Sequence, residues 1–330
     1  MKAIVYNRYG PAEVLRYEEA ARPVPKDDEV LIQVRAASVN PADRVLMRGV
    51  PYAARFVMGL SKSKVKRTGI DVSGLVEAVG SKVTGFRPGD EVFGTCRGAF
   101  AEYVCTPESS VVTKPANVTF EYAAAAPIAG YTALQALRNK GHVQSGQKVL
   151  INGASGGVGT FAVQIAKAFG ADVTGVCSTR NVEMVRSIGA DRVIDYTRED
   201  FTKSGRRYDV IVDNVGNHSL AACRNALGPT GIYVGVGGSW RGYIAVLGHL
   251  IAASVWSRFS KRKLRNLLAR GNVEDLTSLR DLMDSGKVKP VIDRRYGLSE
   301  VPEAMRYLEE GHARGKVIIT VRQDENPGRP

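Results

Sequence analysis

Cysteines and long apolar runs are scarce in this chain, and each scarcity excludes a class of protein. The 330 residues contain only four cysteines, and none of them forms a C-x-x-C pair, which argues against a zinc ribbon or a disulfide framework. No apolar run approaches the roughly 20 residues that a membrane-spanning helix needs. The N-terminus MKAIVYNRYG also lacks the apolar core of a secretory signal, so we expect a cytoplasmic protein with reduced thiols.

Acidic residues are fewer than basic ones, 33 against 46, which gives a formal charge of +13. Two basic clusters stand out, at 62–67 and 257–265, and the other basic residues are spread along the chain. Apart from Trp256 and Phe259, these clusters lack the interleaved aromatic side chains on which nucleic-acid bases stack. We therefore expect a solvated basic surface and no nucleic-acid partner.

The order of the expected elements indicates two domains of different kinds. Up to about residue 115, short strand-like segments alternate with glycine and proline, which is typical of a compact all-β unit. From about residue 120, strand candidates alternate with helices, as in a parallel, doubly wound sheet. The predicted sheet strands are 148–152, 172–177, 192–196, 208–215 and 231–235. The expected divisions are 1–121, 122–286, a return to the first domain at 287–321, and a disordered tail at 322–330.

The segment 149–181 carries the most specific functional signal. Its residues 153–159 read G-A-S-G-G-V-G, which is the dinucleotide fingerprint G-x-G-x-x-G with Ala154 in the first glycine place. A buried strand precedes the fingerprint and an amphipathic helix follows it, so backbone N–H groups at the helix start can face a pyrophosphate. The alternative is a tight turn without a ligand. The expected cofactor contacts are Ala154, Ser155, Gly156, Gly157, Val158 and Gly159.

The residues after the second strand of this sheet indicate which dinucleotide is bound. An acidic residue about 20 positions beyond the fingerprint would accept the ribose hydroxyl of NAD. This chain has no acid there and instead offers Ser178 and Arg180, a hydroxyl and a guanidinium that suit a 2′-phosphate. We therefore predict NADPH rather than NADH. The alternative is that Arg180 is a solvated charge at a helix start.

Several motifs connect the chain to a known family. They include ASVNPADRVLMRG, TGIDVSGLVEAVG, RPGDEVFG, AGYTALQAL and NGASGGVGTFAVQIAKAFGA. On these motifs, residues 1–321 resemble the medium-chain dehydrogenase/reductase superfamily, and within it the zinc-free quinone oxidoreductase branch. The resemblance implies an α/β protein with a GroES-like β-barrel domain and a Rossmann doubly wound parallel-sheet domain. It also implies a homodimer.

The same resemblance argues against a metal site. Zinc-dependent members have a cysteine where this chain has Asn40, and Gly-His-Glu where it has Gly69, Ile70 and Asp71. Zinc needs thiolate, imidazole or carboxylate ligands in a tetrahedral array, and asparagine and isoleucine do not supply them. We therefore expect no metal, and a structural role for Asp71.

The absence of zinc ligands also narrows the expected reaction. Reduction of a simple ketone then needs a positioned proton donor, and the Tyr-x-x-x-Lys motif of short-chain dehydrogenases does not occur. An enone or quinone is easier to reduce than a simple ketone, because addition of hydride gives a delocalised anion that hydrogen-bond donors can stabilise. We expect an NADPH-dependent reductase of small apolar enones or quinones. The alternatives are a carbonyl reductase or alcohol dehydrogenase, and an NADPH-binding sensor or RNA-binding protein of the zeta-crystallin type.

The resemblance implies further site residues. Asn40 and Tyr52 are the catalytic candidates, as possible donors to the substrate, with a loop-fixing amide and a packing tyrosine as the alternatives. Thr132 and Lys316 have a helix cap and a surface charge as their alternatives. The implied cofactor contacts beyond the fingerprint are Thr132, Tyr196, Asn214, Val215, Gly216, Val236, Gly237 and Lys316.

The segment 240–268 departs from the shorter connection of the simplest quinone reductases. Apolar residues recur in it at helical spacing and precede a basic run at 261–265. A basic amphipathic helix over 244–265 can lie on an anionic membrane surface. The alternatives are a helix that covers the active site and a subunit contact.

Overall fold

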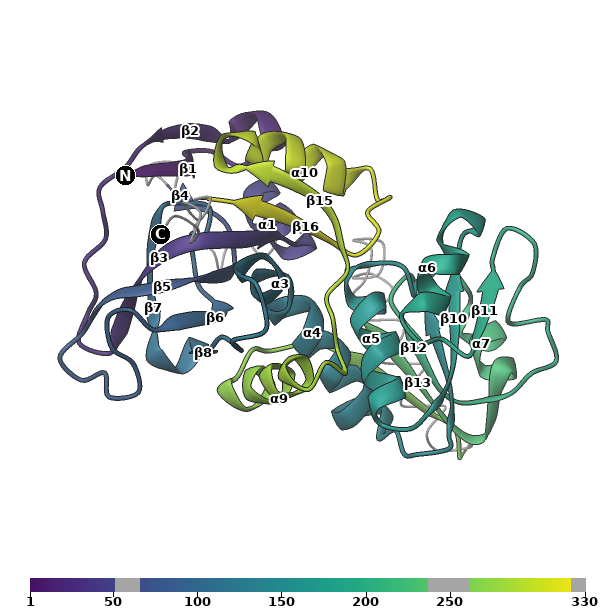
Figure 1. Ribbon diagram of the computed structural model, residues 1–330. Coiled ribbons are helices and arrows are strands. Elements are labelled where there is room, and N and C mark those ends of the chain that lie inside the picture. The colour runs from purple at the N-terminus through teal and green to yellow at the C-terminus, as the bar shows by residue number, and fades with distance from the viewer. Residues whose placement is uncertain (51–65, 237–260, 322–330) are drawn as a thin grey trace, which may run out of the picture. The chain divides into compact units, whose positions relative to one another are not determined.

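A computed structural model describes residues 1–50, 66–236 and 261–321, and the chain divides into two compact units (Figure 1). The first unit comprises Met1–Ile128, Gly271–Ser285 and Pro290–Pro330, and the second comprises Ala129–Arg270 and Gly286–Lys289. Tyr52, Gly237, positions 240–260 and the tail predicted at 322–330 lie outside the described residues. The chain therefore leaves the first unit, builds the second, and returns.

The first unit contains two β-sheets, as the strand-like segments before residue 115 predicted. The smaller sheet has the order β2-β1-β4, and the larger has the order β15-β16-β3-β5-β6-β8, with β7 paired to β3. Its strands are β1 (Lys2–Tyr6), β2 (Arg16–Glu19), β3 (Glu29–Val39), β4 (Lys66–Arg67), β5 (Asp71–Val79), β6 (Glu91–Thr95), β7 (Tyr103–Pro107), β8 (Val111–Thr113), β15 (Ile292–Gly297) and β16 (Lys316–Thr320). Its helices are α1 (Pro41–Arg48), α3 (Phe120–Ala125), α9 (Val273–Asp284) and α10 (Val301–Glu309).

The central strand β3 organises this unit. Its valine, leucine, isoleucine and alanine residues are all buried, and the β-branched side chains among them pack well on a pleated surface. β3 pairs antiparallel with β5, β7 and β16. In these pairings Ser38 lies opposite Asp71 on β5, and Val39 lies opposite Val317 on β16. Three segments far apart in the sequence therefore meet where β3 ends and α1 begins.

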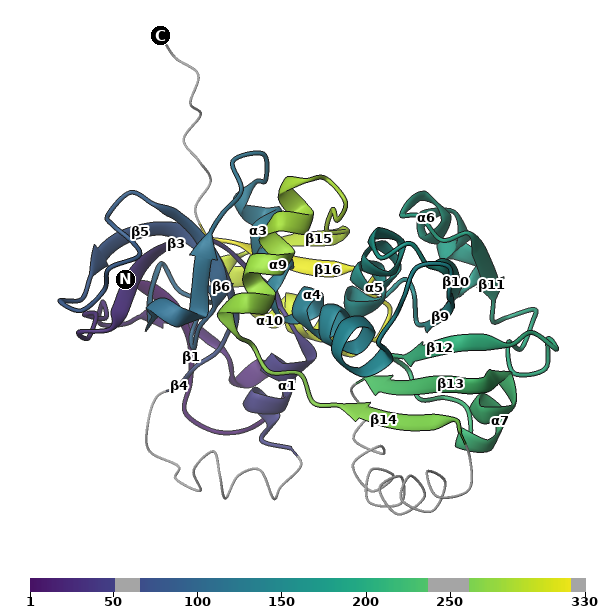
Figure 2. The ribbon, with the colours of Figure 1, turned by 90° about the horizontal axis from the view of Figure 1, so that it is seen from below.

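The second unit is the predicted parallel sheet with helices. Its order is β11-β10-β9-β12-β13-β14, and every pairing is parallel (Figure 2). The strands are β9 (Lys148–Asn152), β10 (Asp172–Cys177), β11 (Arg192–Asp195), β12 (Tyr208–Asp213), β13 (Leu227–Val236) and β14 (Lys263–Leu267). The helices are α5 (Gly157–Ala168), α6 (Val182–Ser187) and α7 (Leu220–Ala226), and α4 (Pro127–Leu134) leads into the unit. The first two strands have the predicted bounds, and β13 begins four residues earlier than predicted.

The basic run at 261–265 differs from the sequence prediction, because part of it forms a strand. A helix over 244–265 was expected, but residues 263–267 form β14, which pairs parallel with β13 at the edge of the sheet. A parallel strand at this position satisfies the backbone groups of β13, and charged side chains are well tolerated on an edge strand. The helix prediction is therefore wrong for 263–265, and residues 244–260 lie outside the described residues.

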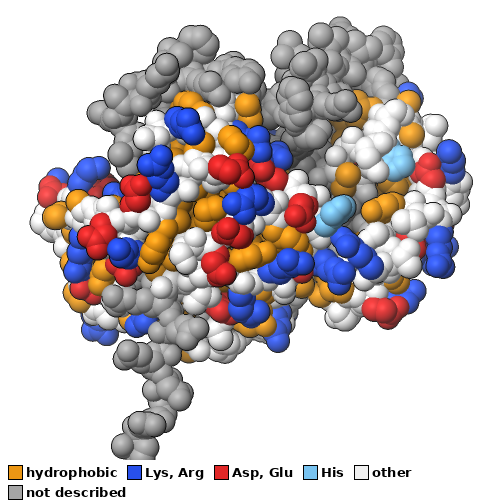
Figure 3. Space-filling model, turned by 90° about the horizontal axis from the view of Figure 1, so that it is seen from above, with side chains coloured by type: hydrophobic (Ala, Val, Ile, Leu, Met, Phe, Trp, Pro, Cys, Tyr) orange, Lys and Arg blue, Asp and Glu red, His pale blue; other side chains and the backbone are white. Residues whose placement is uncertain are grey.

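Charge on the visible face of the molecule is mixed. Figure 3 shows lysine and arginine side chains interspersed with aspartate and glutamate, without one continuous basic area on this face. Several basic residues are paired with acids, for example Arg48 with Glu309 and Lys167 with Asp191. No helix among the described residues has the length and apolar character needed to cross a membrane.

Candidate functional site

The fingerprint loop of the second unit connects β9 to α5 and needs glycine for two different reasons. Gly153 has a φ of +76°, a conformation that other residues rarely adopt. A Cβ atom on Gly159 would lie 2.0 Å from the backbone oxygen of Gly153, so only glycine fits. At Gly156 the nearest protein atom to a Cβ would be 3.5 Å away, which leaves that side of the loop open.

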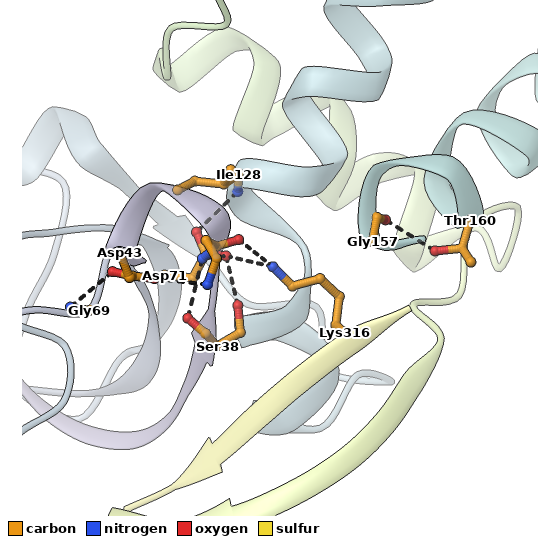
Figure 4. A network of polar contacts seen from close by, with 9 residues as sticks. Ser38, Asp43, Gly69, Asp71, Ile128, Gly157, Thr160 and Lys316 are labelled. Atoms are coloured by element: carbon orange, nitrogen blue, oxygen red, sulfur yellow. Dashed lines mark hydrogen bonds and ion pairs between the residues drawn. The ribbon is translucent and has the colours of Figure 1, made fainter. Parts of the chain in front are cut away.

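The start of α5 supplies the groups that an anion would need. Gly156 caps the helix, and the first N–H groups of any α-helix lack partners within it. Thr160 Oγ1 donates to the backbone oxygen of Gly157 at 3.1 Å, which fixes this first turn (Figure 4). Val158 lies on this turn, whereas Ala154 precedes it and donates its backbone N–H to the oxygen of Val176 at 2.9 Å. A helix start of this kind suits the pyrophosphate that the fingerprint predicts.

Asn181 links this loop to the turn after β10, and the sequence analysis did not identify it. Its Nδ2 donates to Ser155 Oγ at 3.1 Å and to Ser178 Oγ at 3.2 Å. Asn181 is 5% exposed, and within the described part of the chain its Oδ1 has no hydrogen-bond partner. The fingerprint and the predicted phosphate contact at Ser178 are thus held together by one buried amide.

The turn after β10 presents Arg180 at the surface of the unit. The neighbouring Thr179 hydroxyl donates to Asp195 Oδ2 at 2.6 Å, and this bond is the main cause that lowers the pKa of Asp195. Tyr196 follows β11 directly and is 58% exposed. Arg180 and Tyr196 therefore lie at the ends of neighbouring strands, on the edge where a doubly wound sheet binds its ligand.

Asp213, at the end of β12, organises the next loop and was also missed. Its Oδ1 accepts hydrogen bonds from the backbone N–H groups of Val215 at 3.0 Å and Gly216 at 2.9 Å, and from Asn152 Nδ2 at 2.9 Å. Its Oδ2 accepts from the Tyr233 hydroxyl at 2.8 Å. Burial first, and then Asp213, raises the pKa of Tyr233, so this hydroxyl stays protonated as a donor. The hydrogen bonds of Asp213 therefore fix the backbone of the loop 214–216.

Asn214 in this fixed loop keeps an unused acceptor. Its Nδ2 donates to the backbone oxygen of Asn152 at 3.0 Å, which sets the orientation of the amide. Its Oδ1 is buried and has no partner among the described residues. Val236 ends β13 on the same edge, and Thr132 is buried on α4. Glycine cradle, helix start and unused amide oxygens fit a nicotinamide dinucleotide, whose carboxamide and ribose hydroxyls are donors.

The first unit contains a buried charged cluster, defined here as Ser38, Asn40, Asp71 and Lys316. Figure 4 labels Ser38, Asp71 and Lys316 of this cluster. Asp71 Oδ2 accepts from Ser38 Oγ at 2.7 Å and from Asn40 Nδ2 at 2.9 Å, and Lys316 Nζ lies 3.3 Å from it. Asp71 Oδ1 accepts from the backbone N–H of Ile128 at 3.0 Å. Asp71 is therefore the shared acceptor of the cluster.

The side-chain amide of Asn40 makes hydrogen bonds through both its oxygen and its nitrogen. Its Oδ1 accepts from Lys316 Nζ at 2.5 Å, and its Nδ2 donates to Asp71 and to the backbone oxygen of Ser38, the latter at 3.2 Å. The paired strands β3, β5 and β16 bring these residues together. Both amide N–H groups of Asn40 are consequently committed to neighbours in this unit.

Asp43, on the first turn of α1, is a second buried carboxyl beside the cluster. Its Oδ2 accepts from the Asn40 N–H at 2.9 Å and its Oδ1 from the Gly69 N–H at 3.1 Å. Burial, and then the nearby Asp71 carboxylate, raises the pKa of Asp43 to about 7. Asp43 therefore changes its charge near neutral pH while it holds the backbone of Asn40.

The pKa of Asp43 predicts a pH-dependent stability. An aspartate in an unfolded chain titrates near pH ~3.9, so between that pH and the folded pKa of about 7 only the folded state keeps this proton. The free energy of unfolding should therefore decrease as pH rises through this window, by up to about 1.4 kcal/mol per pH unit, and level off above it. Urea unfolding at several pH values measures the slope.

Asp43→Asn is the control for this prediction. The amide cannot accept from both backbone N–H groups, so the variant should be less stable at every pH, but its slope should be shallower than that of the wild type. Equal slopes for the two proteins would contradict the assignment of the titration to Asp43.

The charged cluster does not fit a zinc ion. The ammonium of Lys316 already lies beside Asp71 and would repel a second cation. Cys96 is buried, and burial together with Asp71 and Asp43 raises its thiol pKa, which disfavours the thiolate that zinc needs. In the described residues no group of three or more histidine, cysteine, aspartate or glutamate side chains could hold a metal.

Comparisons with known proteins cover nearly the whole chain. Residues 26–116 match the family "Alcohol dehydrogenase GroES-like domain", and residues 188–319 match "Zinc-binding dehydrogenase". The "NAD(P)H oxidoreductase RTN4IP1, mitochondrial" of Mus musculus is 37% identical, over 97% of this chain and 89% of that protein. The "2-methylene-furan-3-one reductase" of Solanum lycopersicum is also 37% identical, over 97% and 79%.

Solved structures give the same result. The quinone oxidoreductase from Coxiella burnetii superimposes with a TM-score of 0.85 at 34% identity, and covers 98% of this chain and 99% of that one. These matches confirm the predicted fold, a GroES-like domain combined with a Rossmann-type parallel sheet. The zinc-binding description of one matching family is not reproduced by the donor set around Asp71.

Proposed function

This chain is a member of the medium-chain dehydrogenase/reductase superfamily, and from that premise we propose that it is an NADPH-dependent reductase of enones or quinones. Membership carries the coarser statement that it is a nicotinamide-dependent oxidoreductase. The name 2-methylene-furan-3-one describes a C=C bond conjugated to a ketone, and other relatives are named quinone oxidoreductase homologues. Both substrate classes are electron-poor and conjugated.

The observation that carries the proposal is the charged cluster itself. Where zinc-dependent members have a cysteine and Gly-His-Glu, this chain has Asn40 and Gly69–Asp71, and the ammonium of Lys316 is hydrogen-bonded to the Asn40 amide and the Asp71 carboxylate. An enolate or hydroquinone anion is less basic than an alkoxide because its charge is delocalised, so hydrogen-bond donors can stabilise it sufficiently without a metal ion. The cluster therefore suits conjugate reduction.

The residues of the second unit support the dinucleotide and its phosphate. NADPH, when bound, supplies the hydride. The fingerprint cradle and the start of α5 would bind the pyrophosphate, and the loop 214–216 would orient the nicotinamide carboxamide through the unused oxygen of Asn214. Ser178 and Arg180 support the choice of NADPH, because a hydroxyl and a guanidinium bind a 2′-phosphate.

The test is reduction of a medium-chain vinyl ketone with NADPH, followed by loss of nicotinamide absorbance, with the product identified by mass spectrometry. We expect the saturated ketone, formed faster with NADPH than with NADH. Arg180→Gln should lower kcat/KM for NADPH about tenfold and leave that for NADH nearly unchanged, because NADH has no 2′-phosphate for the guanidinium to bind.

Other outcomes point to other functions. An allylic alcohol as product would indicate a carbonyl reductase. Tight binding of NADPH without turnover of an enone or a quinone would indicate a sensor. An equal effect of Arg180→Gln on both dinucleotides would contradict the phosphate assignment.

A further inference from the structure

Two lysines are buried among the described residues of the first unit, and they differ in how many acceptors their ammonium groups contact. Lys114 is 7% exposed, and its Nζ contacts three acceptors, the backbone oxygens of Pro115 at 3.0 Å and Val118 at 2.5 Å, and Glu91 at 2.9 Å. An ammonium has three N–H donors, so each donor of Lys114 has an acceptor. This lysine shows what a purely structural ammonium looks like in this unit.

Lys316 lacks the third acceptor. It is 3% exposed, and within the described chain its Nζ contacts Asn40 Oδ1 at 2.5 Å and Asp71 Oδ2 at 3.3 Å. A surface lysine would give its remaining N–H to water, but Lys316 is shielded from it. A buried donor without a partner is costly, so its retention needs a reason, and binding of a ligand that supplies the missing acceptor is one.

Asn40 differs from Lys316 in this respect. Its two amide N–H groups are bonded to Asp71 and to the backbone of Ser38, and its oxygen is bonded to Lys316. For Asn40 to donate to a substrate, one of these bonds must break, and Asn40 is only 1% exposed. The catalytic role that the sequence suggested for Asn40 therefore conflicts with its hydrogen bonds.

We propose that Lys316, and not Asn40, donates a hydrogen bond to the carbonyl oxygen of the substrate, while Asn40 and Asp71 position its ammonium. The third N–H of Lys316 thus donates to the substrate oxygen that gains negative charge in the reaction. This inference rests on the proposed function and assigns the residue that stabilises its charge. It also gives Lys316 a different role from the cofactor contact implied by the family resemblance.

The electron balance identifies that oxygen. Hydride from the dinucleotide forms a new C–H bond at the β-carbon of an enone, the C=C pair moves to form the enolate, and the carbonyl oxygen becomes negative. The enolate then takes one proton at its α-carbon from water, which yields the saturated ketone. Lys316 keeps its proton throughout and acts by charge and hydrogen bonding alone.

The two substrate classes should depend on Lys316 to different degrees. An enolate places much of its charge on one oxygen, whereas the hydroquinone anion formed from a quinone is a phenolate, whose charge spreads further into the aromatic ring. A charged donor at one oxygen therefore lowers the barrier more for the enone. A lysine that only held the phosphates of the dinucleotide would affect both substrates equally.

The experiment compares Lys316→Met with the wild type, using NADPH with a vinyl ketone and with a quinone, and measures NADPH affinity by fluorescence titration. We expect kcat/KM for the enone to fall between about tenfold and hundredfold, and that for the quinone to fall less than about threefold. The Kd of NADPH should change less than about twofold.

Two further variants separate chemistry from folding. Lys316→Met combined with Asp71→Asn removes the ammonium and the carboxylate together, and without Lys316 the Asn40 amide can turn over to accept from the new amide. This double variant should remain folded, as judged by its thermal unfolding, and show the same loss with the enone. Lys114→Met should lower stability without changing the ratio of enone to quinone activity.

The inference and the proposed function fail in different ways. Absence of turnover by the folded wild-type protein with either substrate would contradict the function. Turnover by the wild type, with equal losses for both substrates and a weaker Kd for NADPH in Lys316→Met, would assign the ammonium to the cofactor phosphates and overturn the inference. Unchanged activity in the folded Lys316→Met protein would also overturn it.

Discussion

Replacement of Gly159 by alanine should destabilise the second unit itself. The added Cβ would lie 2.0 Å from the backbone oxygen of Gly153 and 2.8 Å from backbone atoms of Ala154. Backbone atoms cannot turn aside as a flexible side chain can, so strand β9 and helix α5 must move apart. We expect a loss of about 3 kcal/mol or more in the free energy of unfolding, measured by urea denaturation.

Gly156→Ala is the matched control, because both glycines belong to the fingerprint. Its Cβ would meet the nearest protein atom at 3.5 Å, an ordinary contact, and Gly156 has a φ of −83° that alanine adopts freely. The variant should keep wild-type stability, within about 0.5 kcal/mol. If the pyrophosphate lies against this loop, NADPH affinity should nevertheless fall by about hundredfold, since the methyl group occupies its place.

The pair of glycine variants thus separates folding from binding. Wild-type NADPH affinity in a folded Gly156→Ala protein would place the dinucleotide elsewhere. Normal stability of Gly159→Ala would show that the loop between β9 and α5 is more adaptable than its close contacts indicate.

Removal of the Asp213 carboxylate should have the second large effect. In Asp213→Ala, the Asn152 amide, the N–H groups of Val215 and Gly216, and the Tyr233 hydroxyl all lose their acceptor. Each unsatisfied buried donor costs on the order of 1–3 kcal/mol, although those near the surface recover part of this from water. We expect the free energy of unfolding to fall by about 3–5 kcal/mol, together with weaker NADPH binding.

Asp213→Asn tests whether geometry or charge matters. Its oxygen can keep the three donors that Oδ1 now accepts, and its amide can face the Tyr233 hydroxyl, which turns to accept. This variant should lose only about 1 kcal/mol. A loss as large as that of Asp213→Ala would mean that the negative charge, and not the hydrogen-bond pattern, stabilises the loop.

The local features of the fold were predictable from the sequence, because they depend on neighbouring residues. Strands β9 and β10 and the glycine loop follow from apolar runs and glycine spacing within about 30 residues. The incorrect prediction of a helix at 263–265 also has its cause in the local sequence. A stretch as short as KLRNL fits either period, and its pairing with β13 decides for a strand.

The charged cluster was not predictable in this way. Asn40 and Lys316 are 276 positions apart, and only the pairing of β16 with β3 brings them together. The resemblance indicated both residues but not their contact. It therefore did not show that both amide N–H groups of Asn40 are hydrogen-bonded. Asn181 and Asp213 were missed because a lone asparagine or aspartate after a strand has no distinctive spacing.

The return of the chain to its first unit has a consequence for biosynthesis. The second unit is almost continuous, so it has emerged from the ribosome while β15 and β16 are still being synthesised. A nascent chain therefore holds Asn40 and Asp71 without their ammonium until its last few strands appear. The charged cluster is completed last, and a prematurely terminated chain that ends before residue 316 would contain the parallel-sheet unit but not the ammonium of Lys316.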